Sequence, residues 1–247
     1  LTNCRLKGEK MFIIKNLKKI YKGSTTGIKE ISLTLSDGDI CAFIGSNGAG
    51  KTTTLKSIVG IHSFDTGEII LNGINLKKEP KKFKKMIGYA PDNPDIYENI
   101  RGFEYLNFIG SIYNVNQLDF EKEVNYLSEK LDMKKNLGEL ISNYSHGMKQ
   151  RLVLISIFLH NPDLIVLDEP FVGLDPNAAY FLTNELQKRA SKGVKIIYST
   201  HVLEVAEKIC NRVVLIDNGE VKINGMMKDL ISKGSLSDLF RKATKHE

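Results

Sequence analysis

The stretch Ile40-Cys-Ala-Phe-Ile-Gly-Ser-Asn-Gly-Ala-Gly-Lys-Thr-Thr-Thr-Leu-Lys-Ser-Ile-Val59 decides the fold of this chain. It opens with an apolar, β-prone run, continues through a glycine-rich loop, and becomes an amphipathic helical run from Lys51 onward. Gly45, Gly48 and Gly50 tolerate positive φ and carry no Cβ, so consecutive backbone N–H groups can converge on one anion. The order of strand, glycine loop and helix therefore predicts a phosphate-binding loop.

The loop matches the Walker A pattern, Gly45-x4-Gly50-Lys51-Thr52, without a mismatch. We expect the Lys51 ammonium to reach the β- and γ-phosphates of a nucleotide and to assist catalysis, and the Thr52 hydroxyl to bind Mg²⁺. A chance glycine-rich turn is the alternative. The predicted nucleotide-binding residues of the loop are Gly45, Ser46, Asn47, Gly48, Ala49, Gly50, Lys51, Thr52 and Thr53.

The composition is typical of an ordinary globular protein, with 42% hydrophobic and 26% charged residues in 247. A net charge of +6 suits nucleic acid, an anionic membrane surface or a bound nucleotide, so it does not decide between them. The three cysteines are far apart and form no CxxC pair, which favours reduced thiols over a zinc site. No apolar run approaches the roughly 20 residues of a membrane-spanning helix.

Residues 1–10 are predicted to be a non-native or disordered extension, and they lack the apolar core of an export signal. The run Lys7-Gly8-Glu9-Lys10 can be back-translated as a purine-rich ribosome-binding sequence, which makes Met11 the candidate start. A disordered natural tail is the alternative. We expect the folded part to begin at Met11, where a β-prone run starts.

The rest of the chain predicts a mixed α/β architecture. Alternating runs at 12–14 and 28–35, with strands on either side of the Asn72-Gly73 turn, predict an antiparallel β subdomain beside the phosphate-loop strand. Helical spacing over about 94–162 predicts an inserted helical subdomain. The later runs alternate between strand and helix, which favours a parallel-sheet core with crossover helices. These are strands at 164–167, 195–198, 213–216 and 220–223, helices at 178–190 and 202–210, and a short helical tail over 226–247.

A second half of the site follows the helical region. The run Leu164-Ile-Val-Leu-Asp168-Glu169 is an apolar strand that ends in two carboxylates, as in the Walker B arrangement. Asp168 is expected to hold Mg²⁺ directly or through water, because a hard cation prefers oxygen ligands. Glu169 is expected to orient and deprotonate an attacking water. A pair of surface acids at a strand end is the alternative.

A second anion-binding helix end precedes this strand, in Tyr144-Ser-His-Gly-Met-Lys-Gln-Arg151. Ser145 and the free N–H groups of the helix that begins here can bind an anion. One nucleotide already has its own phosphate loop in this chain. The second helix end is therefore most useful when it faces the γ-phosphate of a nucleotide held by another molecule.

With these motifs, and with Gly173-Leu-Asp-Pro176 and Ser199-Thr-His201, the chain resembles the nucleotide-binding subunits of ATP-binding cassette (ABC) transporters. The resemblance covers nearly all of 11–225 in the family's order, and implies a P-loop NTPase fold and an ABC-type ATP-binding domain over those residues. It also implies hydrolysis of ATP with Mg²⁺ at the interface of a head-to-tail homo- or heterodimer. Integral-membrane permease subunits are the implied partners, and the implied location is cytoplasmic, on the inner face of the cell membrane.

The resemblance also implies roles for single residues. Tyr21 matches the aromatic residue that stacks on adenine, with a surface tyrosine as the alternative. His201 matches the histidine that contacts the γ-phosphate, with a structural histidine as the alternative. Ser145 and Gly147 match residues that bind the neighbour's nucleotide, and Asp175 matches the residue that carries information between the two sites.

Two positions depart from the family's pattern. Asp92 stands where glutamine is usual; it can still bind the metal, but its shorter, charged side chain puts the coupling role in doubt. His146 stands where the first signature glycine is usual, and a positive φ there would cost a histidine about 1 to 2 kcal/mol. We expect ATPase activity to be retained.

Aromatic residues near the start of the helical insertion, Tyr97, Phe103, Tyr105 and Phe108, mark the expected docking surface for a permease, although most of these rings are expected in the core. Two alternatives to a transporter subunit remain. One is a soluble ABC ATPase that acts on nucleic acid or ribosomes, a partner we do not expect. The other is a regulatory nucleotide-binding module with little hydrolysis.

Overall fold

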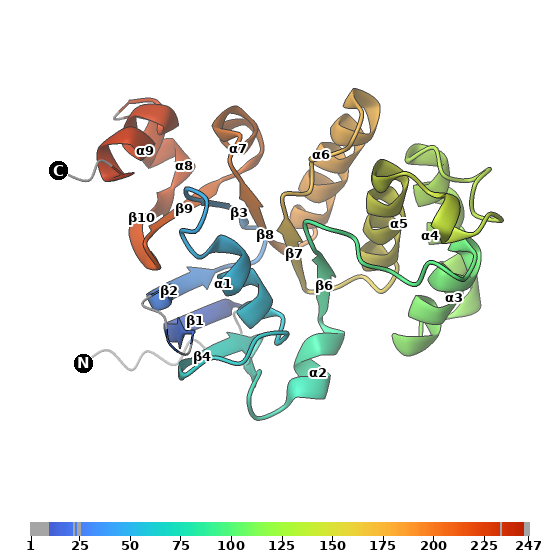
Figure 1. Ribbon diagram of the computed structural model, residues 1–247, viewed down its shortest axis with the longest axis horizontal. Helices are drawn as coiled ribbons and strands as arrows, with labels where there is room; N and C mark the ends of the chain where they lie inside the picture. Colours follow the sequence, from blue (N-terminus) through green and yellow to red (C-terminus); the bar gives the residue numbers. More distant parts are fainter. Residues whose placement is uncertain (1–9, 22, 24–25, 233, 245–247) are drawn as a thin grey trace.

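The computed structural model describes residues 10–244 except 22, 24–25 and 233. The extension predicted over 1–10 therefore lies outside the described residues apart from Lys10. Within the described part, ten strands form one sheet in the order β5-β4-β1-β2-β10-β9-β3-β8-β7-β6 (Figure 1). The strands are β1 (Phe12–Ile20), β2 (Gly27–Leu35), β3 (Ile40–Ile44), β4 (Thr66–Leu71), β5 (Ile74–Asn75), β6 (Ile87–Ala90), β7 (Leu164–Asp168), β8 (Lys195–Thr200), β9 (Arg212–Asp217) and β10 (Glu220–Met226).

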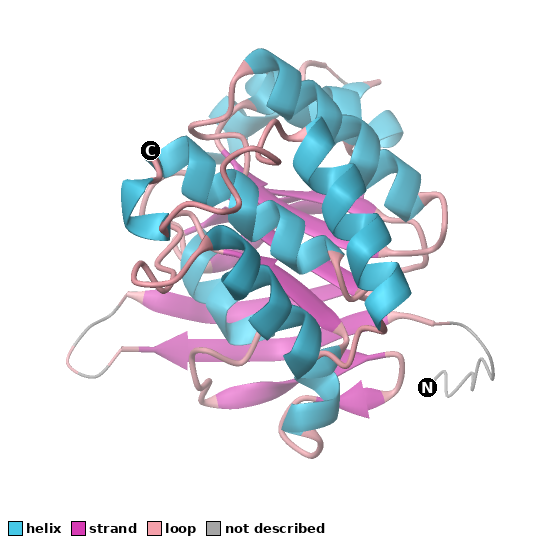
Figure 2. Ribbon diagram, turned by 90° about the vertical axis from the view of Figure 1, so that its right-hand side faces the viewer, coloured by secondary structure: helices cyan, strands magenta, loops and turns pink. Residues whose placement is uncertain are grey.

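The helices of the described part pack over this sheet and extend beyond one edge of it (Figure 2). They are α1 (Lys51–Ile58), α2 (Pro80–Lys85), α3 (Gly102–Ile112), α4 (Gln117–Lys130), α5 (His146–Phe158), α6 (Pro176–Ala190), α7 (Leu203–Ile209), α8 (Met227–Ile231) and α9 (Leu236–Thr244), with a 3-10 turn at Ile141–Asn143. No helix in these described ranges is long and apolar enough to cross a membrane.

The predicted parallel core is confirmed. Strands β6, β7, β8, β3 and β9 run parallel to one another, and every residue of β3, β7 and β8 is buried. Because parallel strands end at a common edge, the loops after β3, β6, β7 and β8 meet there. This edge positions the candidate site.

The predicted antiparallel part is also present, as β5-β4-β1-β2. The first strand is longer than the predicted 12–14, and a bulge explains why the prediction stopped early. Asn16 adopts a positive φ of 46°, and the pairing with β2 shifts register between Ile14 and Leu17. The bulge breaks the alternation of apolar and polar residues, so the pattern no longer shows that the strand continues to Ile20.

The strand predicted at 220–223 is not part of the parallel alternation. It is β10, and it pairs antiparallel with β9 through a tight turn at Asn218 and Gly219, whose φ values are +48° and +75°. Asn-Gly with two positive φ angles is the usual type I′ hairpin turn. On its other side β10 pairs parallel with β2 at Glu220 and Glu30, which joins the two parts of the sheet.

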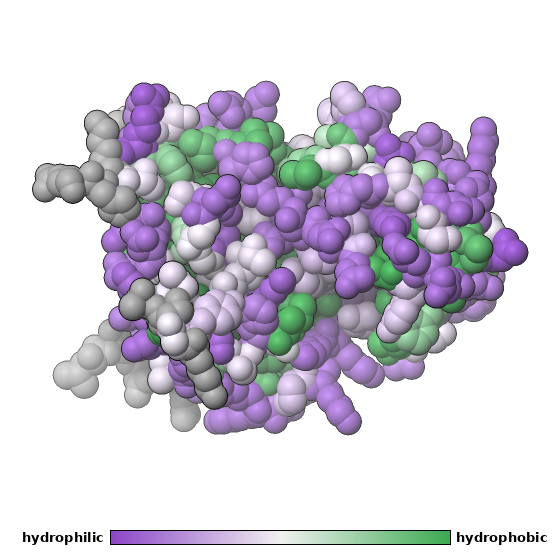
Figure 3. Space-filling model, in the orientation of Figure 1, coloured by the Kyte–Doolittle hydropathy of each residue, from purple (hydrophilic) through white to green (hydrophobic). Residues whose placement is uncertain are grey.

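The helical insertion packs beside β6, and α5 forms its buried centre (Figure 1). The expectation that most of its early aromatic residues are core is wrong. Only Tyr105 is buried, whereas Tyr97, Phe103 and Phe108 are 65%, 44% and 47% exposed. The buried residues of α3 are Gly102, Tyr105, Leu106 and Gly110, and Gly110 lies directly against Phe120 of α4. Figure 3 shows apolar side chains gathered over this end of the molecule.

Candidate active site

A cavity of about 270 Å³ lies at the carboxyl edge of the parallel strands and brings most of the predicted site residues together. It is lined by Tyr21, Thr26, Gly27, Ser46, Asn47, Gly48, Gly50, Lys51, Thr52, Thr53, Asp92, Asp168 and Glu169. The sequence reasoning missed Thr26 and Gly27. A signal for them existed, because the glycine-containing turn between the first two predicted strands ends at Gly27.

The phosphate loop has the backbone geometry that its glycines predict. Gly48 and Gly50 adopt φ values of +80° and +105°, and Gly50 caps the start of α1. A Cβ at Gly45 would lie 2.4 Å from the Ile216 carbonyl oxygen, so this position excludes a side chain. The loop therefore presents a bare backbone to the cavity, next to the positive end of α1.

Lys51 lies across the inside of the loop. Its Nζ donates to the carbonyl oxygens of Gly45 at 2.7 Å and Ser46 at 3.2 Å, and the residue is only 8% exposed. These contacts hold the ammonium against the same backbone that lines the cavity. A polyanion in the cavity would meet a positive charge that is already positioned.

Asp168 ends β7 with one oxygen engaged and one free of protein contacts. Its Oδ1 accepts a hydrogen bond from Ser199 Oγ at 2.5 Å, whereas the buried Oδ2 has no hydrogen-bond partner among the described residues. A buried anionic oxygen without a partner is costly unless a cation faces it. Thr52 and Asp92 line the same cavity, so these residues fit Mg²⁺. In the described part no three His, Cys, Asp or Glu side chains form a metal cluster, so water and phosphate oxygens would complete the coordination.

Glu169 is turned by its own backbone toward His201. Its φ is +48°, which is uncommon for a residue with a side chain. Nδ1 of His201 lies 3.0 Å from Glu169 Oε2 and can donate its proton to that carboxylate. His201 is 64% exposed on its side chain and also lines a neighbouring cavity of about 440 Å³ with Ser46 and Asn47. Two of the three predicted catalytic side chains, Glu169 and His201, are therefore in contact at the edge of the nucleotide cavity.

Tyr21 lines the cavity just after β1. Its hydroxyl is within hydrogen-bonding distance of Thr53 Oγ1 at 3.2 Å and His62 Nδ1 at 3.4 Å. The ring is 39% exposed, so one side remains open. Partial burial, followed by the charges of Lys56 and Lys19, lowers the pKa of His62, which favours the neutral ring beside Tyr21.

The predicted second anion site lies elsewhere, and Ser145, Gly147 and Asp175 do not line this cavity. Ser145 caps α5, and its Oγ accepts from the Met148 N–H at 3.3 Å. His146 is the first helical residue and its φ is not positive, so the strain considered for it does not arise. Gly147 is required, because a Cβ there would lie 2.7 Å from the Gly173 carbonyl oxygen.

Asp175 joins the second anion site to the helix after β7. Its Oδ1 accepts from the N–H groups of Asn177 at 2.9 Å and Ala178 at 3.2 Å, and it thereby caps α6. Its Oδ2 forms an ion pair with Arg151 of α5. The Ala178 N–H, with smaller effects from Asn177 and Arg151, lowers the pKa of Asp175. The carboxylate therefore links the start of α6 to the second turn of α5.

Comparisons with known proteins agree with this geometry. Residues 28–172 match the family model described as ABC transporter. Two curated relatives come from Bacillus subtilis (strain 168): the ABC-type transporter ATP-binding protein EcsA is 33% identical over 89% of this chain and 91% of its own length, and the linearmycin resistance ATP-binding protein LnrL is 33% identical over 90% and 71%.

Solved structures are similar as well. An ATP-binding subunit of an ABC transporter superposes with a TM-score of 0.90 at 31% identity, over 95% of this chain and all of that one. The ATP-binding cassette MJ0796, solved as a post-hydrolysis dimer bound to ADP and Pi, shares the fold with a TM-score of 0.79 at 20% identity, over 87% of this chain and 98% of its own. These matches confirm the predicted α/β P-loop NTPase fold. The chain belongs to the ABC transporter family as an ATP-binding subunit with ATPase activity.

Proposed function

We propose that this subunit binds MgATP at the interface of a head-to-tail dimer and uses its hydrolysis to drive a separate membrane permease. One observation carries the proposal: the chain holds two anion-binding elements that do not share a cavity. Lys51 and the phosphate loop line the nucleotide cavity, whereas Ser145 caps α5 outside it. A second copy, homologous or identical, would bring its own Ser145 to this cavity.

The residues of one chain supply most of the proposed chemistry. Lys51 and the loop N–H groups would bind the phosphates and stabilise charge that develops on them. Glu169 would accept a proton from the attacking water, and His201, in contact with Glu169, would hold that carboxylate and the γ-phosphate in place. Mg²⁺, held by Thr52, Asp168 and Asp92, would supply electrostatic stabilisation of the phosphate oxygens.

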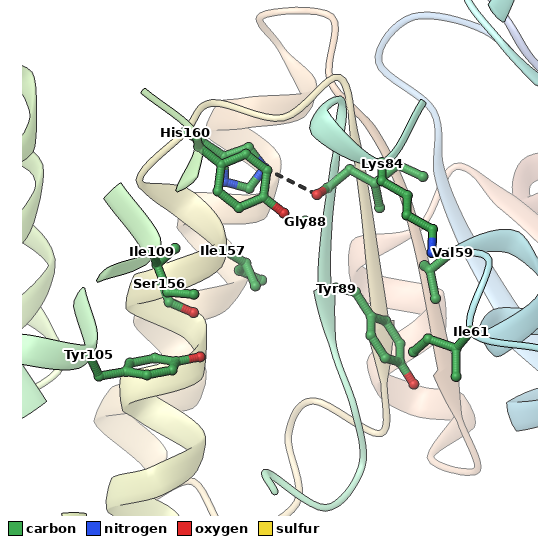
Figure 4. Close-up of a pocket in the computed structure, with 12 residues that line it drawn as sticks. Val59, Ile61, Lys84, Gly88, Tyr89, Tyr105, Ile109, Ser156, Ile157 and His160 are labelled. Atoms are coloured by element: carbon green, nitrogen blue, oxygen red, sulfur yellow. Dashed lines mark hydrogen bonds between the residues drawn. The ribbon is translucent and has the colours of Figure 1, made fainter. Parts of the chain in front are cut away.

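The proposed permease contact is a second cavity, of about 280 Å³, between the helical insertion and the rest of the chain (Figure 4). Tyr105 and Ser156 line it on the insertion side, and Tyr89 and Ile61 line the opposite side. Ile61 is 57% exposed, which leaves apolar surface at the rim. Tyr89 belongs to β6, the strand that leads to Asp92 in the nucleotide cavity. Movement of a docked permease segment would therefore reach the nucleotide through β6.

This contact would place the subunit on the inner face of the cell membrane beside its permease. Two features support such a partner. The family and the curated relatives are transporter ATP-binding proteins, and Tyr97 and Phe108, in edge-to-face contact with ring centres 6.1 Å apart, are exposed on the insertion.

The dimer can be tested with a Glu169→Gln variant, in which hydrolysis should fall by about 10²- to 10⁴-fold because the general base is lost. With ATP and Mg²⁺, light scattering should show a dimer that ADP does not produce. Adding Ser145→Arg should abolish this dimer, while Asn116→Arg, at the N-cap of α4, should leave it intact. An ATP-dependent dimer that survives Ser145→Arg would contradict the head-to-tail arrangement, and unchanged phosphate release by Glu169→Gln would contradict the role of Glu169.

A further inference from the structure

We propose that Ser199 is a positioning residue that ties Asp168, on the metal side of the site, to Glu169, on the water side. The inference rests on the roles proposed above for these two carboxylates. Ser199 lies on β8 in register with Asp168 on β7, and it is fully buried. It touches neither nucleotide nor water in this scheme, so it would act only through its neighbours.

The single hydroxyl of Ser199 makes two hydrogen bonds of opposite sense. It donates to Asp168 Oδ1 at 2.5 Å and accepts from the Glu169 backbone N–H at 2.9 Å. A serine hydroxyl has one proton, so the proton given to Asp168 leaves only the oxygen lone pairs for Glu169. The two bonds therefore fix each other's direction, and both adjacent residues are held from one atom.

The bond to Asp168 sets which carboxylate oxygen remains available. Oδ1 is engaged by Ser199, and Oδ2 is buried without a partner among the described residues. Without the Ser199 hydroxyl, no hydrogen bond from the protein would fix this orientation of the carboxylate. The hydroxyl thus presents Oδ2 to the position that Mg²⁺ would take.

The bond to Glu169 supports an unfavourable backbone conformation. Glu169 has a φ of +48°, a left-handed conformation that is unfavourable for a residue with a side chain. The Ser199 oxygen holds the N–H group at the start of this turn. The turn in turn aims the carboxylate at Nδ1 of His201, 3.0 Å away. Ser199 is therefore placed to keep the metal ligand and the general base in a fixed relation.

The experiment compares Ser199→Thr and Ser199→Val, which have nearly equal shapes but differ in the hydroxyl, with Ser199→Ala as a smaller variant. The dissociation constant of a fluorescent ADP analogue is measured with Mg²⁺ and with EDTA, and the ratio of the two constants is compared. Melting temperature and kcat are measured for the same proteins.

In the Val and Ala variants, the factor by which Mg²⁺ tightens binding of the ADP analogue should fall about tenfold, because a hydrogen bond to a charged group is lost. The dissociation constant in EDTA should stay unchanged. Their kcat should fall by at least as much, and the Thr variant should keep both properties. A merely structural role would lower the melting temperature and leave the Mg²⁺ ratio unchanged.

Equal Mg²⁺ ratios in Thr and Val variants would overturn the proposal, even if all three substitutions lower the melting temperature. So would Val and Ala variants with a wild-type ratio and kcat. Failure of the proposed function is a separate result. It would appear as unchanged hydrolysis in Glu169→Gln, or as an ATP-dependent dimer that survives Ser145→Arg.

Discussion

Several single positions in this protein are set by the space around the backbone rather than by the chemistry of a side chain. Gly45 faces the Ile216 carbonyl, Gly147 faces the Gly173 carbonyl, and neither contact leaves room for a Cβ. Both glycines sit in segments that the sequence predicts to bind anions. The segment around Gly147 at the start of α5 is therefore packed against the segment around Gly173, which follows β7 in the same chain.

Replacement of Gly147 by alanine tests this packing. The new Cβ would lie 2.7 Å from the Gly173 carbonyl oxygen, and neither backbone segment can shift freely. We expect a loss of roughly 1 to 3 kcal/mol in the free energy of unfolding, measured with urea. Gly138→Ala is the matched control, because a Cβ there meets nothing within 4 Å. Equal stabilities of the two variants would show that the segments are not locked together.

His160 should make the free energy of unfolding depend on pH in the acidic range. Its ring stacks on Tyr113 with centres 3.6 Å apart, and its Nε2 lies 3.1 Å from the Ile87 carbonyl oxygen, to which it can donate. Burial lowers its pKa from 6.5 to about 4; the bond to Ile87 opposes this shift, and Arg189 adds to it. The folded state therefore favours the neutral ring.

Between pH 6.5 and about 4 the unfolded chain carries a proton on His160 that the folded chain does not. The stability of the folded state should accordingly fall as the pH falls through this window, by roughly 3 kcal/mol in total. His160→Phe keeps an aromatic ring for Tyr113 and removes the titrating group. Urea unfolding at pH 7 and pH 4.5 should show a smaller difference for this variant, and an unchanged difference would exclude His160 as the source.

Asp175 shows how one side chain can define the start of an element. It caps α6 through Asn177 and Ala178, and its ion pair with Arg151 reaches α5. The helices of the two proposed dimer motifs are thereby joined within the chain. A substitution at Arg151 in α5 should therefore change the stability of the start of α6.

Asp175→Ala should cost about 1 kcal/mol of unfolding free energy through loss of the cap. Because the folded-state pKa of Asp175 is lowered, this contribution is present above the ordinary aspartate pKa and is lost as the pH falls through the folded-state value. A double-mutant cycle with Arg151→Met, followed by urea unfolding at pH 7, would measure the ion pair separately. If the effects of the two substitutions simply add, Asp175 at the start of α6 and Arg151 in α5 are not energetically coupled.

Elements with one regular pattern were predictable from the sequence, and those with a local irregularity were not. The buried strand β7 and helix α6 follow directly from an apolar run and a helical period. Strand β1 was underestimated because of the bulge at Asn16, and β10 was misassigned because its direction depends on the Asn218-Gly219 turn. Ser199 could not be recognised, because its two partners are adjacent in space but 31 and 30 residues away in sequence.

For the molecule as a whole, the nucleotide cavity draws on both parts of the sheet. Tyr21 and Gly27 come from the ends of antiparallel strands, whereas Lys51 and Asp168 follow or end parallel strands. The motifs predicted which residues matter, because each motif is local in sequence. The turn before Gly27 was visible in the sequence, but no motif showed that Thr26 and Gly27 line this cavity, since that depends on how the two parts of the sheet are joined.

Bound nucleotide should stabilise the entire fold. At a concentration about 100 times its dissociation constant, ATP with Mg²⁺ should add roughly 2.7 kcal/mol to the free energy of unfolding, visible as a higher melting temperature. Lys51→Met should remove most of this gain. Lys82→Met, on the solvent-facing side of α2 and outside the cavity, should retain it. A full gain in the Lys51 variant would show that the ammonium does not bind the phosphates.

The seam between β2 and β10 has a mechanical consequence. Glu220 pairs there with Glu30, and the Gly219 carbonyl accepts from the N–H groups of Lys29 at 2.9 Å and Glu30 at 3.4 Å. An ion pair between the Lys29 and Glu220 side chains, 3.4 Å apart, also crosses this junction. Tyr21 lies beside β1 and β2, whereas Lys51 and Asp168 belong to the parallel part, so the two sides of the nucleotide cavity are joined in the sheet through this short contact. A ligand that contacts both sides of the cavity should restrict twisting of β2 against β10. Amide hydrogen exchange at Lys29 should therefore slow when nucleotide binds, and it should slow more than exchange inside β3.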